Sequence, residues 1–550
     1  MRRSLSVAAF TSVVAAVLWA AAPAGAAADK RTAGHGRAAA TISWGECSDP
    51  LLKAVHAQCG YLSVPLDYAH PSGAQIQIAV SRITHTSDLY QGILLTNPGG
   101  PGGSGLHLNT FLIGALQQEG FSAAAAGYDW IGFDPRGVGS SKPALTCNPN
   151  YFRADRPNYI PLNIALLTFW LSYSKSYAQA CAAVSPQQTA LLNHMTTRDA
   201  AMDMNRIREA LGQRQMTYYG YSYGTYLGQV YSTLFPSHVR RLIMDSNVDP
   251  RKIWYQANLN QDIAFNRNEN IWLGWLAKYD SVYHLGATKS AVESLFYATK
   301  RQLAEHPAGG VVGPDEWLDA FLPAGYFQQT WLGLAKVFSD YINRHSADAT
   351  NALIAAYQGA DSPGNDNGFA VYLAVSCTDT QWPTEWSVWA RDNSRVNREA
   401  PFFTWGNAWF NAPCIYWPAP AAHPVQINGR GIGNALLIDE TLDAATPFTG
   451  SLEVRHLFPH SVLLAEPGGT THADSLAGNL CVDSTIANYL LTGALPPRKP
   501  DARWDATCAP LPVPVPTAAA SSRAQSSRAA ATRAARRAAS RLGLPAVTLR

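Results

Sequence analysis

Three residues that lie far apart in the chain could together make a serine into a nucleophile. Ser222 lies in Gly220-Tyr221-Ser222-Tyr223-Gly224, a G-x-S-x-G pattern, and Asp443 and His472 follow it along the chain. A serine hydroxyl is a poor nucleophile until a base takes its proton. That base in turn needs a carboxylate to hold its tautomer and stabilise its charged form. These residue types predict acyl transfer through a covalent intermediate at Ser222.

The residues around Ser222 have the pattern of a strand, a sharp turn and a helix. Residues 216–221 form a short aromatic run that predicts a strand, and Tyr226, Val230 and Leu234 then recur every fourth residue, as in a helix. Such a turn holds a serine hydroxyl clear of the backbone, and the glycines make room for it. The alternative is a glycine-rich turn with an incidental serine, and the other features of the chain argue against it.

Asp443 and His472 both follow predicted strands late in the chain. Apolar runs at residues 434–438 and 461–465 precede them, and a helix is expected over residues 449–457 between the two. Because parallel strands end at the same edge of a sheet, both side chains are expected at that edge.

Other side chains compete for these two roles. Asp439 or Glu440 could be the acid in place of Asp443. His456 and His460 are rival bases, but we expect the first on the helix and the second before the strand. Neither would then meet a serine at the carboxyl edge of the sheet, so we predict Asp443 as the acid and His472 as the base.

A glycine loop could supply the donors that bind the oxyanion in acyl transfer. Residues 97–105 read Asn-Pro-Gly-Gly-Pro-Gly-Gly-Ser-Gly and follow a short apolar strand at residues 92–95. We predict that the N–H group of Tyr223 binds the oxyanion together with the N–H groups of Gly100 and Gly99. The loop lacks the lysine of a phosphate loop and the glycine spacing of a dinucleotide site, so we expect no cofactor. The remaining alternative is a tight loop without a ligand.

Strands and helices alternate in two separate parts of the chain. Further strands are predicted at residues 75–80, 128–133 and 242–244, and helices at residues 197–211 and 484–491. This alternation predicts an α/β fold, a mostly parallel sheet with helices on both faces. Between the two parts the patterns are helical, which predicts a large, mainly helical cap inserted into the α/β core. These helices are expected at residues 263–278, 289–306, 326–344 and 351–357.

Composition shifts divide the chain into six segments. Arg2-Arg3, an apolar stretch and Ala24-Gly25-Ala26 predict a signal peptide for the general secretory route, with a twin-arginine signal as the alternative. The predicted segments are a signal peptide (1–26), a flexible or pro-segment (27–40), the first part of the core (41–250), the cap (251–425), the second part of the core (426–508) and a disordered tail (509–550). No other stretch is apolar and long enough to predict a membrane span.

The eight cysteines predict disulfides, because their number is even and they follow an export signal. No C-x-x-C or close Cys/His pair occurs, so we expect no metal site. The sequence does not determine the connectivity. We take sequential pairing as the expectation: Cys47 with Cys59, Cys147 with Cys181, Cys377 with Cys414, and Cys481 with Cys508.

The net charge of +3 hides an uneven distribution of charge. Residues 509–550 carry seven Arg and no acid, and residues 1–40 carry five Lys or Arg and one Asp, which leaves about −8 for residues 41–508. An acidic body argues against nucleic acid as a partner. The basic tail is expected to be a solvated extension, with binding to an anionic cell surface as the minority alternative.

Several motifs taken together resemble one family. Residues 97–102, Asp134-Pro135-Arg136-Gly137, residues 222–228, residues 442–447 and the glycine-rich loop that ends at His472 occur in this order. They resemble the secreted tripeptidyl and prolyl aminopeptidases, a group of bacterial serine peptidases with the α/β-hydrolase fold. Intracellular prolyl aminopeptidases have His where this chain has Pro98, which favours the tripeptidyl branch.

The resemblance implies a secreted, extracellular exopeptidase that releases tripeptides or single residues from peptides with a free N-terminus. Such an enzyme must bind the substrate's ammonium group, and we name Asp379 and Glu385 in the cap as candidates. We expect a monomer. A carboxylic-ester hydrolase with the same triad is the first alternative, and a non-catalytic secreted binding protein on a hydrolase scaffold is the second.

Overall fold

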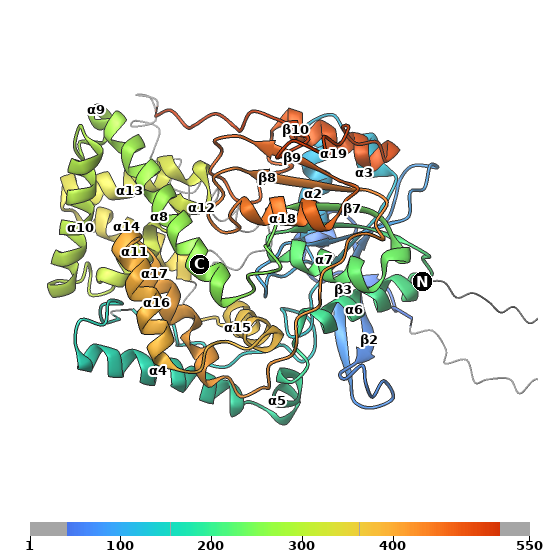
Figure 1. The fold of residues 1–550 in the computed structure, drawn as a ribbon, viewed down its shortest axis with the longest axis horizontal. Helices are drawn as coiled ribbons and strands as arrows, with labels where there is room; N and C mark the ends of the chain where they lie inside the picture. The colour runs from blue at the N-terminus through green and yellow to red at the C-terminus, as the bar shows by residue number, and fades with distance from the viewer. Residues whose placement is uncertain (1–40, 155, 362–363, 517–550) are drawn as a thin grey trace, which may run out of the picture. The chain divides into compact units, whose positions relative to one another are not determined.

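The computed structural model describes residues 41–154, 156–361 and 364–516 (Figure 1). The predicted signal peptide, the segment 27–40 and most of the predicted tail lie outside these residues. Within them, no helix has the length and apolar character needed to cross a membrane.

A mixed sheet forms the centre of the fold. Its order in the described residues is β1-β2-β3-β5-β4-β6-β7-β8-β9-β10. The pairs β1–β2, β2–β3 and β3–β5 are antiparallel, and the neighbouring pairs from β5 to β10 are parallel. The strands are β1 (Gly45–Glu46), β2 (Gln58–Pro65), β3 (Gln75–Ile83), β4 (Ile93–Asn97), β5 (Asp129–Phe133), β6 (Met216–Tyr221), β7 (Val239–Asp245), β8 (Ala435–Glu440), β9 (Ser461–Glu466) and β10 (Ala506–Thr507).

The parallel strands are buried on both faces, which explains their continuous apolar runs. Leu94, Ile243 and Leu436 pack on one face, whereas Leu95 and Leu242 pack on the other, as the two-residue period of a strand requires. The first face is covered by α2 (Leu108–Gln118), α3 (Ser122–Ala126) and α19 (Leu480–Thr492). The second is covered by α6 (Thr197–Ala210), α7 (Tyr223–Leu234) and α18 (Thr449–Leu457). This arrangement is the predicted α/β core.

The part of the chain between β7 and β8 in the sequence forms helices, and these lie beside the sheet, on the left of Figure 1. The longest is α8 (Tyr255–Lys278), which packs against several of the others. They include α10 (Lys289–Glu305), α11 (Pro314–Phe321), α12 (Pro323–Tyr326), α13 (Trp331–Arg344), α14 (Ala347–Asp361), α15 (Asn367–Asp379), α16 (Trp386–Glu399), α17 (Thr404–Asn411) and η3 (Ala412–Tyr416). We call residues 251–425 the cap.

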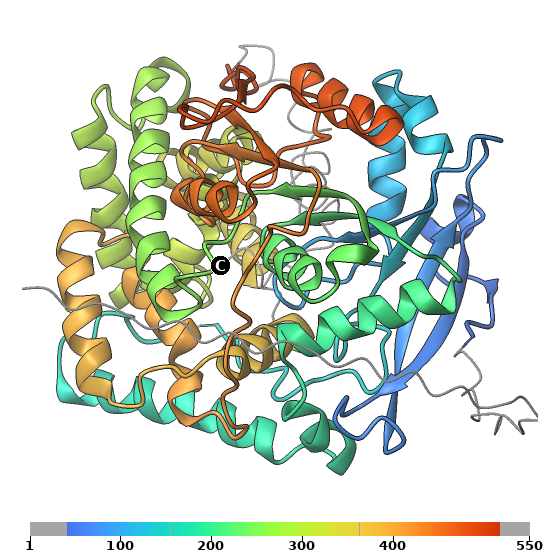
Figure 2. The ribbon, with the colours of Figure 1, turned by 45° about the vertical axis from the view of Figure 1, so that its right-hand side comes forward.

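A helix from an earlier part of the chain joins the cap. α4 (Ile164–Ala182) lies between β5 and α6 in the sequence, yet it packs against α17 and η3 and runs along the same side in Figure 2. The buried Arg156 guanidinium binds Glu316 at 3.0 Å and Asp319 at 2.6 Å in α11. The helical layer therefore includes residues that the sequence-based boundary placed in the first part of the core.

The cysteines form four disulfides, and each joins a cysteine to the next one in the chain. The pairs are Cys47–Cys59, Cys147–Cys181, Cys377–Cys414 and Cys481–Cys508. This is the sequential pairing expected above. Each bridge ties a loop of at most 37 residues, so the disulfides strengthen local segments.

The first residues of the predicted disordered tail are ordered. Asn479 Nδ2 donates to the carbonyl of Ala509 at 2.9 Å, and Trp275 Nε1 in α8 donates to the carbonyl of Pro514 at 2.9 Å. Residues at the start of the segment predicted to be disordered therefore contact both the core and the cap. Proline cannot donate a backbone hydrogen bond, but the carbonyl of Pro514 still accepts one from the cap.

Candidate active site

Ser222 occupies a strained turn between β6 and α7. Its backbone has φ 55° and ψ −126°, a conformation that costs a residue with a side chain on the order of 1–3 kcal/mol. Its N–H donates to the carbonyl of Asp245 at 3.0 Å, and its carbonyl accepts from Thr225. A Cβ on Gly224 would lie 2.8 Å from the carbonyl oxygen of Asn97, so this position requires glycine. The serine is thus held by neighbouring strands of the core.

His472 and Asp443 contact each other at the carboxyl edge of the sheet. His472 Nδ1 lies 2.7 Å from Asp443 Oδ2, and both residues are almost fully buried. The N–H groups of Ala445 and Thr446 donate to Asp443 Oδ1. Burial acts to raise the pKa of Asp443, but the charge of His472 and these hydrogen bonds outweigh it, and the pKa lies below its ordinary value. A carboxylate held ionised here can orient a histidine and stabilise its charged form.

The rival acids contact other groups, and the rival bases do not follow the strand ends that carry Asp443 and His472. Asp439 accepts from Ser451 Oγ at 2.6 Å, and Glu440 accepts from the N–H of Thr471. His456 lies in α18, and His460 directly precedes β9. Of the three candidate carboxylates, Asp443 is the one that His472 contacts in the described structure.

Ser222 and His472 line one cavity between the core and the cap. Pro101, Tyr223 and Thr446 belong to its core wall. The cap contributes aromatic and amide side chains: Trp254, Asn258, Asn260, Gln261, Tyr326 and Tyr372. An apolar wall with a few polar groups is typical of a site that binds a small ligand.

The glycine loop lies against the turn that carries Ser222. Gly100 lines the cavity, as does Tyr223, whose N–H belongs to the first turn of α7 and has no intrahelical acceptor. Gly99 differs from the prediction, because its N–H donates to Asn97 Oδ1 at 2.9 Å. A Cβ on Gly99 would lie 2.6 Å from the carbonyl oxygen of Tyr221. Gly99 therefore permits close contact with the turn, and its N–H is committed to Asn97.

Asp134 holds the far end of the glycine loop. Its Oδ1 accepts from Ser104 Oγ at 2.6 Å and from the N–H of Gly105 at 3.1 Å. Its Oδ2 accepts from the N–H of Ser140 at 2.8 Å. Asp134 opens the Asp-Pro-Arg-Gly motif after β5, so the position of that motif was a signal for this role.

Cap residues hold the loop of Asp443, which sequence reasoning missed. Asn268 Nδ2 in α8 donates to the carbonyls of Leu442 at 3.0 Å and Thr470 at 3.3 Å. Arg267 donates to the carbonyl of Asp443 at 3.1 Å. No local signal marks these residues, because their targets lie about 175 residues further along the chain.

The loop of His472 is also held by groups from outside it. The His472 N–H donates to the carbonyl of Tyr326 at 2.8 Å, and Gln328 Nε2 donates to Thr470 Oγ1 at 2.9 Å. On the core side, the N–H of Ala473 donates to Ser246 Oγ at 2.7 Å. The histidine thus depends on both the cap and the core for its position.

The two carboxylates proposed for the ammonium group of a substrate do not line this cavity. Asp379 is buried and accepts from the N–H and the hydroxyl of Thr197, both at 2.6 Å, and from Trp254 Nε1 at 3.2 Å. Glu385 is exposed, at the start of α16. Asp379 instead lies behind Trp254, a residue of the cavity wall, and the structure gives neither carboxylate a place in the site.

Comparisons with known proteins agree with this fold. A family model described as alpha/beta hydrolase fold matches residues 92–287, and one described as TAP-like protein matches residues 400–526. The tripeptidyl aminopeptidase of Streptomyces lividans is 42% identical over 490 residues, which cover 87% of this chain and 88% of that protein. The serine protease Hip1 of Mycobacterium tuberculosis is 30% identical over 481 residues, 83% of this chain and 90% of that protein.

A third relative carries a different activity in its name. Carboxylesterase B of Mycobacterium tuberculosis is 30% identical over 477 residues, which cover 83% of this chain and 88% of that protein. All three relatives therefore align with both the core and the cap. The chain belongs to the α/β-hydrolase family, in the branch of TAP-like proteins.

Proposed function

We propose that this protein is a secreted serine exopeptidase that releases short peptides, tripeptides above all, from the free N-terminus of peptide substrates. One observation carries the proposal: Ser222, at a strained turn, lines the same cavity as His472, whose Nδ1 contacts Asp443. The tripeptidyl aminopeptidase of Streptomyces lividans, at 42% identity, supports the choice of peptide substrates.

The reaction follows from the roles of these three groups. Asp443 accepts a hydrogen bond from Nδ1–H of His472, which leaves Nε2 free to act as the base. Nε2 takes the proton of Ser222 Oγ as the oxygen attacks the peptide carbonyl, and later gives that proton to the leaving amine. The N–H groups of Tyr223 and Gly100 bind the oxyanion. Water then attacks the acyl-enzyme and releases the short peptide.

The cap favours an exopeptidase because its residues form one wall of the cavity. Asn258, Gln261 and Tyr372 stand in that wall, and Gln261 is anchored to the carbonyl of Ala445 at 2.5 Å. Such a wall limits how much of a chain can lie beyond the attacked bond. It also offers amide and hydroxyl groups to the backbone of a short peptide.

Ester hydrolysis is the second candidate, because Carboxylesterase B of Mycobacterium tuberculosis is 30% identical to this chain. The same triad serves both reactions, and the wall of the cavity decides between them. Wild-type protein is therefore assayed with alanyl-alanyl-prolyl naphthylamide, with single-residue naphthylamides and with p-nitrophenyl acyl esters.

The peptidase proposal expects release of the tripeptide and loss of that release in Ser222→Ala. Ser484→Ala, at an exposed serine in α19, serves as the control and is expected to retain full activity. Fast ester turnover without amide turnover would establish the esterase. No turnover and no labelling by a fluorophosphonate would leave a binding protein on a hydrolase scaffold.

Secretion is part of the proposal. The disulfides support it, because such bridges persist in oxidising compartments. We expect the culture medium to contain the mature protein with an N-terminus after Ala26, which N-terminal sequencing of the secreted form measures. Retention of the whole chain inside the cell would contradict it.

A further inference from the structure

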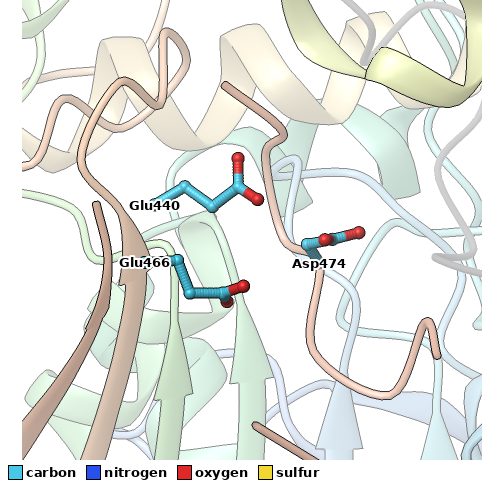
Figure 3. Close-up of side chains that lie close together, drawn as sticks. All are labelled: Glu440, Glu466 and Asp474. Atoms are coloured by element: carbon cyan, nitrogen blue, oxygen red, sulfur yellow. The ribbon is translucent and has the colours of Figure 1, made fainter. Parts of the chain in front are cut away.

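Three buried carboxylates lie together next to the loop of His472 (Figure 3). Glu440 ends β8, Glu466 ends β9, and Asp474 follows His472 by two residues. One oxygen from each carboxylate lies within 4.8 Å of the corresponding oxygens of the other two. Exposed fractions of 3%, 1% and 6% place all three inside the protein.

The cluster has few partners for its negative charge. Glu440 Oε2 accepts the N–H of Thr471, and Glu466 Oε2 accepts from Asn479 Nδ2 at 2.6 Å. Asp474 Oδ2 is fully buried and has no hydrogen-bond partner among the described residues. No lysine, arginine or histidine of the described chain forms an ion pair with any of the three.

An uncompensated cluster of this kind is costly when ionised. Burial, and then the charges of Asp474 and Glu466, raise the pKa of Glu440 to about 10. Burial, and then the charge of Asp245, raise the pKa of Glu466 to about 8. Buried carboxylates are stable when they are protonated or when they bind a cation.

We propose that Glu440, Glu466 and Asp474 bind a divalent cation of the size of calcium. Carboxylate oxygens are the ligands that hard cations prefer, and calcium binds them at about 2.3–2.6 Å. Two ligands on opposite sides of one calcium ion are then about 4.6–5.2 Å apart. Oxygens within 4.8 Å of one another can therefore all be ligands of one calcium ion. Magnesium keeps several of its waters and is rarely enclosed by protein carboxylates alone, so it suits this buried cluster less well.

The bound cation would stabilise the loop that carries the histidine. Two residues of this loop, on either side of His472, are connected to the cluster. The N–H of Thr471 donates to Glu440, and Asp474 is itself one of the three proposed ligands. Neutralising the cluster would keep β8, β9 and this loop together. The sequence prediction of no metal site considered Cys and His patterns, whereas these ligands are carboxylates that only the fold brings together.

Direct binding tests the proposal and does not depend on any catalytic assay. The full-length secreted protein is stripped with a chelator, dialysed into metal-free buffer and titrated with calcium chloride. We expect about one calcium ion per chain by elemental analysis, and a rise in Tm of at least about 2 °C that magnesium chloride does not match. Absence of stoichiometric calcium together with an unchanged Tm in millimolar calcium would overturn the proposal.

A matched pair of variants locates the ion. Glu466→Gln keeps the shape of the side chain but removes one ligand charge, and it is expected to weaken calcium binding at least tenfold and to lose the rise in Tm. Glu453→Gln, in α18, removes one charge outside the cluster and is expected to respond as the wild type does. If the carboxyls share protons instead, Glu466→Gln is as stable as the wild type, and neither protein responds to calcium.

Discussion

The two sides of the candidate active site are held by different parts of the molecule. Ser222 depends on groups that are close in the core: the carbonyl of Asp245 and the hydroxyl of Thr225. The loops of Asp443 and His472 are held by the cap as well, through Asn268 and the carbonyl of Tyr326, in addition to the core contact between Ala473 and Ser246. The cap therefore does more than line the cavity, because it also helps to hold the loops of Asp443 and His472, the proposed acid and base.

Removing a member of the triad is the strongest test of this comparison. Ser222→Ala and His472→Ala are each expected to lower kcat by about 10⁴- to 10⁶-fold, because the nucleophile or its base is lost. Single-turnover and steady-state assays with a tripeptidyl naphthylamide measure the loss. His456→Ala in α18 is the control and is expected to retain activity. Similar loss in the control would point to a structural effect.

The turn that carries Ser222 can be disturbed without replacing a residue of the triad. A Cβ at Gly224 would come within 2.8 Å of the carbonyl oxygen of Asn97, so Gly224→Ala is expected to displace the turn. Overpacking of this kind costs about 1–3 kcal/mol, and we expect a fall of about 100-fold in kcat with a lower Tm. Gly114→Ala, where the structure leaves open space, is the matched control. Full activity in Gly224→Ala would show that the turn tolerates displacement.

Asn268→Ala removes hydrogen bonds by which the cap holds the loops of Asp443 and His472. The loss of buried hydrogen bonds to the carbonyls of Leu442 and Thr470 costs about 1–3 kcal/mol, and we expect kcat to fall about tenfold with little change in KM. Asn270→Ala lies on the same helix, and its side chain bonds within that helix, to the carbonyl of Asn266. Equal kinetic constants for the two variants would show that Asn268 of the cap does not position the triad.

The smallest effect on catalysis is expected where the cap and the core meet behind the cavity, and there we predict a change in stability. Burial outweighs the hydrogen bonds from Thr197 and Trp254 and raises the pKa of Asp379 to about 7, from 3.8. The unfolded chain therefore binds fewer protons than the folded one between about pH 4 and pH 7, and stability falls as the pH rises through this window. In Asp379→Asn we expect this slope to shrink by up to about 1.4 kcal/mol per pH unit.

Chemical denaturation at several pH values measures the slope for Asp379→Asn. Asp392→Asn, at a partly exposed carboxylate in α16, is the control and is expected to give a curve parallel to that of the wild type. A slope in Asp379→Asn equal to that of the wild type would mean that Asp379 is ionised throughout this pH range.

Local patterns in the sequence predicted much of the core. The strand at residues 216–221 has the predicted bounds, and the helix over residues 449–457 was also predicted. The strand is a continuous aromatic run that is buried along its whole length, and the helix spans the interval between two predicted strands. β2 and α4 were missed, because the alternation in β2 is confined to its second half and α4 has a weak amphipathic pattern. Periodicity is informative only where one face of an element differs clearly from the other.

The sequence by itself determined many elements of the core and the order of the candidate catalytic residues. The glycines around Ser222 and the apolar runs before Asp443 and His472 are local patterns, so they can be recognised in one amino-acid sequence. Only the tertiary structure decided which of Asp439, Glu440 and Asp443 meets the histidine, and that the N–H of Gly99 is bonded to Asn97. The first of these contacts spans 29 residues and the second only two, and both depend on how the loops fold against neighbouring strands, which no spacing along the chain encodes.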